Sequence, residues 1–153
     1  MFFTAERYKQ LKELILGKDL FHSITLSDYL FAKSLLFAKV NLSDEEFRLY
    51  HKLYDIIRQP LIQPDLLIYL HVPINILQKN IRKRNRPYEQ DIQDQYLFNI
   101  QEAYIHYIKQ HNIKTLFIDA ANADFLSNEK HLKVITDALE QEYDDGQHYF
   151  TLP

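Results

Sequence analysis

Apolar residues recur at a helical spacing along most of the chain, which predicts a series of amphipathic helices. Ser43 and Glu46 have the spacing of a capping box, so a helix is expected to begin there, and Pro60 and Pro64 follow its end. Ser127 is the expected N-cap of the last helix. The predicted helices cover residues 2–16, 28–40, 43–57, a stretch after Pro73, 93–111 and 127 to about 142.

The first predicted helix lacks an N-cap and starts with apolar Phe2 and Phe3, whereas Gly17 suits its C-cap. An uncapped apolar start is typical of a helix that has been cut partway along its length.

Two nearly continuous apolar runs, residues 65–72 and 114–120, predict parallel strands buried on both faces, and residues 22–27 predict a short third strand. Strands that alternate with helices indicate an α/β domain with a parallel sheet. Three strands are few for such a sheet, so strands are expected to be missing. The last residues, 144–153, are expected to form a loose polar tail.

The composition of the chain argues against several classes of function. The net charge of −3 argues against general binding of nucleic acid or membranes, and no apolar run approaches the length of a membrane span. The absence of cysteine excludes disulfides and thiolate metal sites, and a cytoplasmic protein is the default expectation. The two glycines, Gly17 and Gly146, cannot form a Gly-x-x-x-x-Gly-Lys-Ser/Thr phosphate loop, because Gly17-Lys18 is followed by Asp19.

An arginine-rich segment, residues 80–92, carries four basic side chains among five positions: Arg82, Lys83, Arg84 and Arg86. Three interpretations stay open at this point. The cluster is a solvated helix end that suits the helix dipole, a nucleic-acid patch, or a closing loop that binds phosphate.

Two further positions follow predicted strands, where ligands bind in open parallel sheets. The stretch 118–125 offers Asp119, Asn122 and Asp124, which equally suit turns or a helix cap. Asp28 is either an N-cap or a carboxylate for Mg²⁺ or a substrate hydroxyl. The seven histidines show no ligand spacing, so no metal site is predicted from them.

Read in order, these pieces resemble the deoxynucleoside kinases, the family of deoxyguanosine, deoxyadenosine and deoxycytidine kinases. The resemblance runs from about Phe2 to Tyr143 and is most specific in "PDLLIYLHVP" followed by "IRKRNRPYEQDIQDQYLFNIQEAY". "RYKQL", "SDYLFAKSLLFAKVNL", "LYHKLYDII" and "IDAANADF" occur in the expected order around it.

The resemblance implies that the arginine-rich segment is the family's lid. Arg84 and Arg86 would then contact the transferring phosphates, and Glu89 would hold the deoxyribose. Asn80 stands where the family often has arginine, and Arg82 is the expected substitute at the ATP. Arginines on a closing lid suit phosphoryl transfer, which depends on positioning and on neutralisation of phosphate charge.

Other roles implied by the resemblance concern the nucleobases of the acceptor and of ATP. Arg7 would read the nucleobase of the acceptor and Phe37 would stack on it, whereas Asp124 and Phe125 would lie in the loop that holds the adenine of ATP. The resemblance also implies ATP and Mg²⁺ as cofactors, a role in nucleotide salvage, a homodimer, and no nucleic-acid or membrane partner.

The implied fold is a P-loop kinase-like three-layer α/β/α domain over residues 1–143, incomplete because the N-terminal strands of the family have no counterpart. That missing part would hold the phosphate loop and the catalytic carboxylate. We therefore expect the chain to be the C-terminal portion of such a kinase, unable to transfer phosphate alone.

Two departures affect the acceptor site. Ser27-Asp28-Tyr29 replaces the usual Asp/Glu-Arg-Ser/Thr, and Lys33 stands where an acid is expected, so the base preference is open. Two rival functions also remain: a non-catalytic module that binds a nucleotide or a kinase subunit, and a small RNA-binding protein.

Overall fold

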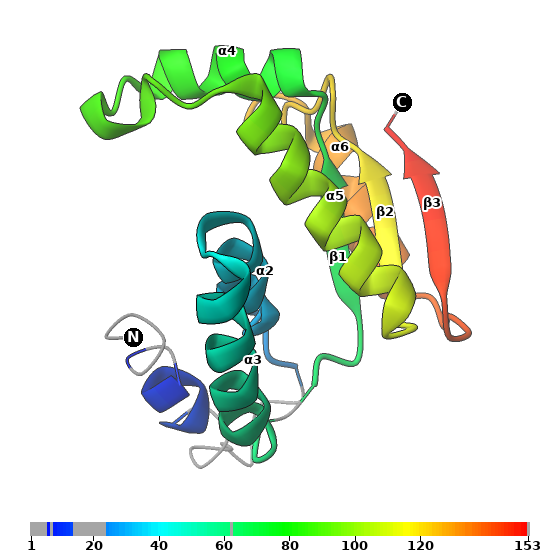
Figure 1. Ribbon diagram of the computed structural model, residues 1–153. Coiled ribbons are helices and arrows are strands. Elements are labelled where there is room, and N and C mark those ends of the chain that lie inside the picture. Colours follow the sequence, from blue (N-terminus) through cyan, green and yellow to red (C-terminus); the bar gives the residue numbers. More distant parts are fainter. Residues whose placement is uncertain (1–5, 7, 14–23, 62, 153) are drawn as a thin grey trace. The chain divides into compact units, whose positions relative to one another are not determined.

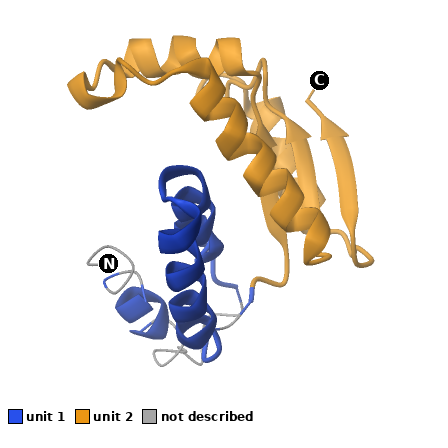
Figure 2. Ribbon diagram, viewed as in Figure 1, with its two compact units in different colours: residues 1–63 blue, residues 64–153 orange. Residues whose placement is uncertain are grey.

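A computed structural model describes residues 6, 8–13, 24–61 and 63–152, and the chain divides into two compact units, residues 1–63 and 64–153 (Figure 2). Residues 6 and 8–13 are helical, in agreement with the first predicted helix. Both ends of that helix, including Gly17, lie outside the described residues.

The first unit contains helices α2 (Ala32–Asn41) and α3 (Asp44–Arg58), which pack together. Phe31 and Tyr54 stack with ring centroids 5.3 Å apart, and both side chains are buried. α2 begins later than predicted, with Phe31 at the N-cap position, so of the two alternatives for Asp28 the N-cap is wrong.

The N-terminus of α3 confirms the predicted capping box. The backbone N–H of Ser43 donates to the Glu46 carboxylate at 2.9 Å, and the Glu46 N–H donates to the Ser43 hydroxyl at 3.4 Å. The Ser43 hydroxyl also donates to the Glu46 carboxylate at 2.7 Å. This bond, together with the bond from the Ser43 backbone N–H, holds the pKa of Glu46 below its ordinary value, because both favour the charged carboxylate. The sequence determines this helix start locally.

The predicted strand at 22–27 is not confirmed over its described part, because residues 24–27 adopt no regular secondary structure. The side chains of Ile24 and Leu26 are 76% and 79% exposed. None of the described strands pairs with residues 24–27, and their apolar alternation alone does not make them a strand.

The second unit contains a parallel sheet of β1 (Leu67–His71), β2 (Thr115–Asp119) and β3 (Gln147–Thr151), in that spatial order. Figure 1 shows α5 (Asp94–Gln110) in front of the sheet and α6 (Glu129–Leu139) behind it. α4 (Ile74–Arg84) and the short helix η1 (Pro87–Glu89) lie between β1 and α5 in sequence. This arrangement confirms the α/β class with a parallel sheet.

β2 is the centre of the sheet. Its residues Thr115, Leu116, Phe117 and Ile118 are buried in succession, which requires cover on both faces as well as a neighbour on each side. β1 is less buried than predicted: only β2 pairs with it among the described residues, and Leu70 is 45% exposed.

The last strand corrects the prediction of a loose tail. Residues Gln147–Thr151 pair in parallel with β2, which supplies the backbone hydrogen bonds that a loose segment would lack. Gly146 enters the strand at φ 119°, a conformation that favours glycine, and its carbonyl accepts from the Thr115 N–H at 2.8 Å. The domain boundary predicted at residue 143 stays a prediction.

An aromatic row crosses the sheet on the residues Tyr69, Phe117 and Tyr149, which are register partners on the three strands. The ring centroids lie 5.1 Å apart between Tyr69 and Phe117 and 5.2 Å apart between Phe117 and Tyr149. Such aromatic pairs stabilise neighbouring strands and fix their register.

None of the described helices is long and apolar enough to cross a membrane.

Candidate functional site

The arginine-rich segment begins on α4, whose last turn carries Arg82, Lys83 and Arg84. α4 ends at Asn85, which has a left-handed φ of 53° and donates its N–H to the Ile81 carbonyl at 3.1 Å. Asparagine tolerates this conformation better than most residues, so it suits the C-cap. The reversal at Asn85 turns the chain back along the helix end.

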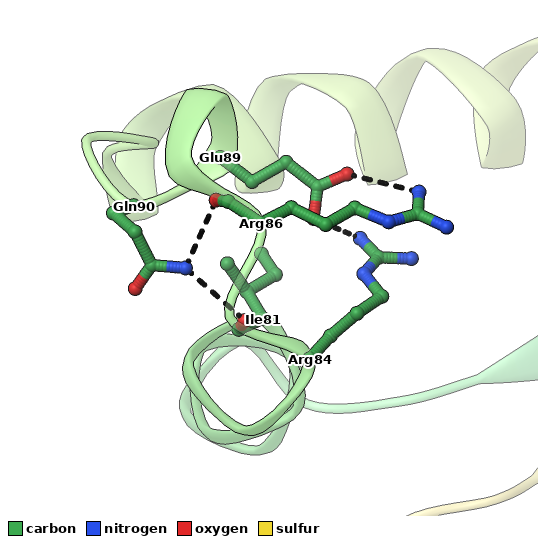
Figure 3. A network of polar contacts seen from close by, with 5 residues as sticks. All are labelled: Ile81, Arg84, Arg86, Glu89 and Gln90. Atoms are coloured by element: carbon green, nitrogen blue, oxygen red, sulfur yellow. Dashed lines mark hydrogen bonds and ion pairs between the residues drawn. The ribbon is translucent and has the colours of Figure 1, made fainter.

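This reversal brings one carboxylate between two guanidinium groups (Figure 3). Glu89 on η1 accepts from Arg84 Nη2 at 2.5 Å through Oε2 and from Arg86 Nη1 at 3.4 Å through Oε1. The Glu89 side chain is 12% exposed, whereas those of Arg84 and Arg86 are 51% and 52% exposed. The carboxylate is therefore largely covered, and each arginine keeps half of its surface open.

Two glutamines fasten this segment to α4. Gln90 Nε2 donates to the carbonyls of Arg86 at 3.1 Å and Ile81 at 3.5 Å (Figure 3). Gln78 Nε2 donates to the Ile92 carbonyl at 2.7 Å, across fourteen positions of sequence. The segment is consequently a folded turn held at both ends by side-chain to backbone hydrogen bonds.

The chemistry offered by this turn is anion binding. Two exposed guanidinium groups present planar sets of N–H donors that match phosphate oxygens. Arg82 is exposed and forms no ion pair with any residue that the structure describes. The basic side chains also favour the C-terminal end of the α4 dipole, but that explanation does not account for Arg86, which lies beyond the helix.

A second candidate group follows β2, in a loop that we call the Asp124 loop (residues 120–128). Asp124 Oδ1 accepts from the backbone N–H groups of Ser127 at 2.9 Å and Leu126 at 3.2 Å. The pKa of Asp124 is lowered, chiefly by the Ser127 N–H, which favours the charged carboxylate. The side chain of Phe125 is partly exposed and that of Leu126 fully exposed.

The Asp124 loop is also held by a residue that the sequence did not single out. The N–H of Asp124 donates to Nδ1 of His131 at 3.0 Å, and the His131 side chain is buried. Asp124 was predicted from its place after a strand, but histidine spacing contains no signal for a bond to a backbone N–H seven residues away.

The N-cap of α6 lies one residue beyond the prediction. Asn128, not Ser127, occupies this position, and its Oδ1 accepts from the Lys130 N–H at 3.1 Å. The helix also ends at Leu139, short of the predicted residue 142. Ser127 lies within the turn closed by Asp124, to whose carboxylate its N–H donates, and the acceptor at the start of α6 is the Asn128 side chain instead.

The residues predicted to contact the acceptor base, Arg7 and Phe37, belong to the first unit, whereas Glu89 belongs to the second. Phe37 on α2 is partly buried, and Lys33 Nζ lies 5.8 Å from the centre of its ring, a cation–π arrangement one helical turn apart. Lys33 therefore lies beside the predicted stacking residue. Asp28 is exposed, and Arg7 lies outside the described residues.

Within the second unit, the two candidate groups lie in separate places. The carboxyl ends of β1 and β2 meet where the Ala120 N–H donates to the His71 carbonyl at 2.8 Å, so the Asp124 loop starts beside the start of α4. The arginines lie at the opposite end of α4 (Figure 1). No hydrogen bond or ion pair joins the two groups among the described residues.

The described residues contain no group of three or more histidine or acidic side chains suited to a metal ion.

Comparison with known proteins identifies the family. The deoxynucleoside kinase family matches residues 1–143. The chain belongs to the deoxynucleoside kinase family. It is 32% identical over 136 residues to a deoxyguanosine kinase from Bacillus subtilis, a match that covers 84% of this chain and 64% of that protein. It is 26% identical over 150 residues to a deoxyadenosine kinase from Lactobacillus acidophilus, a match that covers 88% of this chain and 67% of that kinase.

A deoxyguanosine kinase from Lactobacillus acidophilus is 30% identical over 102 residues, which are 63% of this chain and 45% of that protein. The chain thus spans about two thirds or less of the length of these relatives. The family match includes both the arginine-rich segment and the Asp124 loop.

Proposed function

We propose that the chain belongs to an ATP-dependent kinase that phosphorylates the 5′-hydroxyl of a purine deoxynucleoside. In this reaction the hydroxyl oxygen forms a bond to the γ-phosphorus, the bond from that phosphorus to the β–γ bridging oxygen breaks, and ADP leaves. The hydroxyl proton passes to a general base. The purine preference is proposed because the similar proteins are named deoxyguanosine and deoxyadenosine kinases.

The observation that carries this proposal is the joint placement of Arg84, Arg86 and Glu89 on a turn inside the family match. A phosphate that meets this turn finds two guanidinium groups whose orientation is already fixed by one carboxylate. Prearranged donors of this kind stabilise the charge that spreads over phosphate oxygens during transfer. Arg84 and Arg86 are therefore the proposed phosphate ligands, with Arg82 as a further cation for ATP.

Glu89 has two compatible roles in this proposal. It orients the arginines before ATP arrives, and one of its oxygens then accepts from a hydroxyl of the deoxyribose. The proposed base sites are Asp124 and Phe125 for adenine and Arg7 and Phe37 for the acceptor. The ammonium group of Lys33, which lies beside the Phe37 ring, favours an electron-rich base in the acceptor site.

Turnover also needs a loop that surrounds the β-phosphate, and the sequence contains no Gly-x-x-x-x-Gly-Lys-Ser/Thr. We propose that the chain of 153 residues binds ATP without transferring phosphate. Mg²⁺ would accompany ATP, as phosphoryl transfer requires, and no protein ligand is assigned to it here. The proposal for the complete kinase includes a homodimer that functions in nucleotide salvage.

The test compares two proteins in an ATP-dependent assay with a mixture of deoxynucleosides. The first is the 153-residue chain, and the second is a fusion in which it follows the N-terminal part of the Bacillus subtilis deoxyguanosine kinase. Turnover by the fusion and its loss on Arg84→Ala are expected. A folded fusion that binds both substrates without turnover contradicts the proposal.

The missing loop motif specifically favours a second candidate, a non-catalytic module that binds nucleotides through the same turn. Both candidates predict ATP binding by the 153-residue chain. Only the kinase proposal predicts that the fusion transfers phosphate, so the assay separates them.

A further inference from the structure

We infer that His131 is a positioning residue that holds the Asp124 loop in the shape needed for the base of a nucleoside triphosphate. The assignment of the ligand depends on the proposed function, whereas the role of His131 in the loop stands on geometry. His131 is one of two buried polar residues among those described, the other being Thr115, and it lies in the first turn of α6.

The hydrogen bonds around Asp124 leave this loop little freedom. Its N–H donates to His131 Nδ1 at 3.0 Å, its carbonyl accepts from the Asn128 N–H at 3.1 Å, and its carboxylate accepts from two further N–H groups. The His131 N–H donates in turn to the Asn128 carbonyl at 3.1 Å. The loop and the start of α6 thus form one hydrogen-bonded unit.

His131 contributes the one bond in this unit that comes from a buried side chain. In a neutral imidazole, Nδ1 accepts a hydrogen bond only when the proton is on Nε2, so the bond from Asp124 fixes that tautomer. The bond is partly buried, and a partly buried N–H left without its acceptor is costly, so the bond to Nδ1 helps to keep Asp124 in place.

The consequence for binding follows from the neighbouring side chains. Asp124 turns the chain so that Phe125 is partly exposed and Leu126 fully exposed at the carboxyl end of the sheet, where ligands of open parallel sheets bind. If the base of ATP rests on this loop, its affinity depends on a turn that is already formed. Without the His131 bond, part of the binding free energy of ATP would be spent on ordering the loop, so affinity would fall.

Two substitutions separate the bond from the burial of His131. In His131→Asn the side-chain oxygen replaces Nδ1 as an acceptor, whereas in His131→Gln the amide reaches the position of Nε2 and leaves the Asp124 N–H unpaired. His131→Ala removes the side chain. Far-ultraviolet circular dichroism checks folding, and the Asn and Gln variants decide the question if the alanine variant fails to fold.

The experiment measures backbone amide exchange at Asp124, Leu126 and Ser127 in the 153-residue chain, together with titrations of ATP and deoxyguanosine. In His131→Gln we expect exchange at Asp124 to accelerate and ATP affinity to fall, each by about three- to tenfold, the effect of one lost hydrogen bond. His131→Asn should stay close to the unsubstituted chain, and deoxyguanosine affinity should not change in any variant.

Three results would overturn the inference. Unchanged exchange at Asp124 in His131→Gln would show that the bond does not hold the loop. Accelerated exchange with unchanged ATP affinity would refute the link to the base and leave the proposed function intact. Failure of the unsubstituted chain to bind ATP would refute the proposed function together with the assigned ligand.

Discussion

Glu89 accepts a hydrogen bond of 2.5 Å from Arg84 although five positions of sequence and a left-handed turn at Asn85 separate them. The second oxygen of the same carboxylate faces Arg86 at 3.4 Å. The carboxylate is covered, whereas each guanidinium group keeps about half of its surface open to solvent.

Arg84→Ala in a catalytically complete version of the protein should lower kcat about 100-fold, the usual scale for losing one charge-stabilising donor. The KM for the deoxynucleoside should change much less, because Arg84 is assigned to the phosphate. Steady-state kinetics with each substrate varied in turn measure both values.

Lys83→Ala is the matched control for Arg84→Ala, since Lys83 is exposed in the same helical turn and makes no ion pair with any described residue. A similar loss in both variants would mean that general positive charge, not the geometry of Arg84, supports transfer.

Glu89→Gln should have opposite effects on the two substrates. Removal of the negative charge leaves Arg84 and Arg86 unneutralised, so ATP affinity at low salt should rise about two- to fivefold, the scale of an exposed ion pair. Deoxynucleoside affinity should fall, because glutamine is a weaker acceptor for a sugar hydroxyl. Titrations at two salt concentrations measure both, and weaker ATP binding would show that orienting the arginines outweighs their neutralisation.

The Asp124 loop should loosen in acid. The folded pKa of Asp124 lies below the ordinary value of 3.8, so its stabilising effect is complete above that value and is lost as the pH falls through the folded pKa. Amide exchange at Ser127, corrected for its intrinsic pH dependence, should therefore lose protection below about pH 4. Asp124→Asn retains an oxygen acceptor without a titrating charge, so this variant should abolish the pH dependence.

Ser43→Ala should destabilise α3 by about 1 kcal/mol, because it removes the side-chain acceptor of the capping box. Urea unfolding followed by circular dichroism measures the change in the free energy of unfolding. Ser43→Asp keeps an acceptor at the N-cap and should retain most of the stability; equal losses in both variants would argue against the cap.

The sequence predicted those features that depend on near neighbours or on continuous burial. The capping box at Ser43 involves residues three apart, and the apolar run at 114–120 indicated a buried strand that is observed as β2. Burial of β1 was overestimated, because an apolar run does not reveal how many strands will pair with it. β3 was missed because its polar residues resembled a tail, and its stability comes from the distant edge of β2.

The candidate site shows the same division. The basic residues of the arginine-rich segment and the carboxylate of Glu89 were visible in the sequence. The pairing of Glu89 with two arginines was not, because it depends on the reversal at Asn85. The bond from Asp124 to His131 joins backbone to side chain and leaves no residue pattern to detect.

The aromatic row gives the sheet an optical signature. The chain has no tryptophan, so tyrosine dominates its near-ultraviolet circular dichroism, and Tyr69 and Tyr149 flank Phe117 on the three strands. Burial, with the charge of Glu102, raises the pKa of Tyr69 above its ordinary value of 10.0, so its phenol should ionise later than a solvated one. Because Tyr149 on β3 stacks on Phe117 of β2, detachment of β3 should remove the near-ultraviolet dichroism of Tyr149, which can be observed without a label.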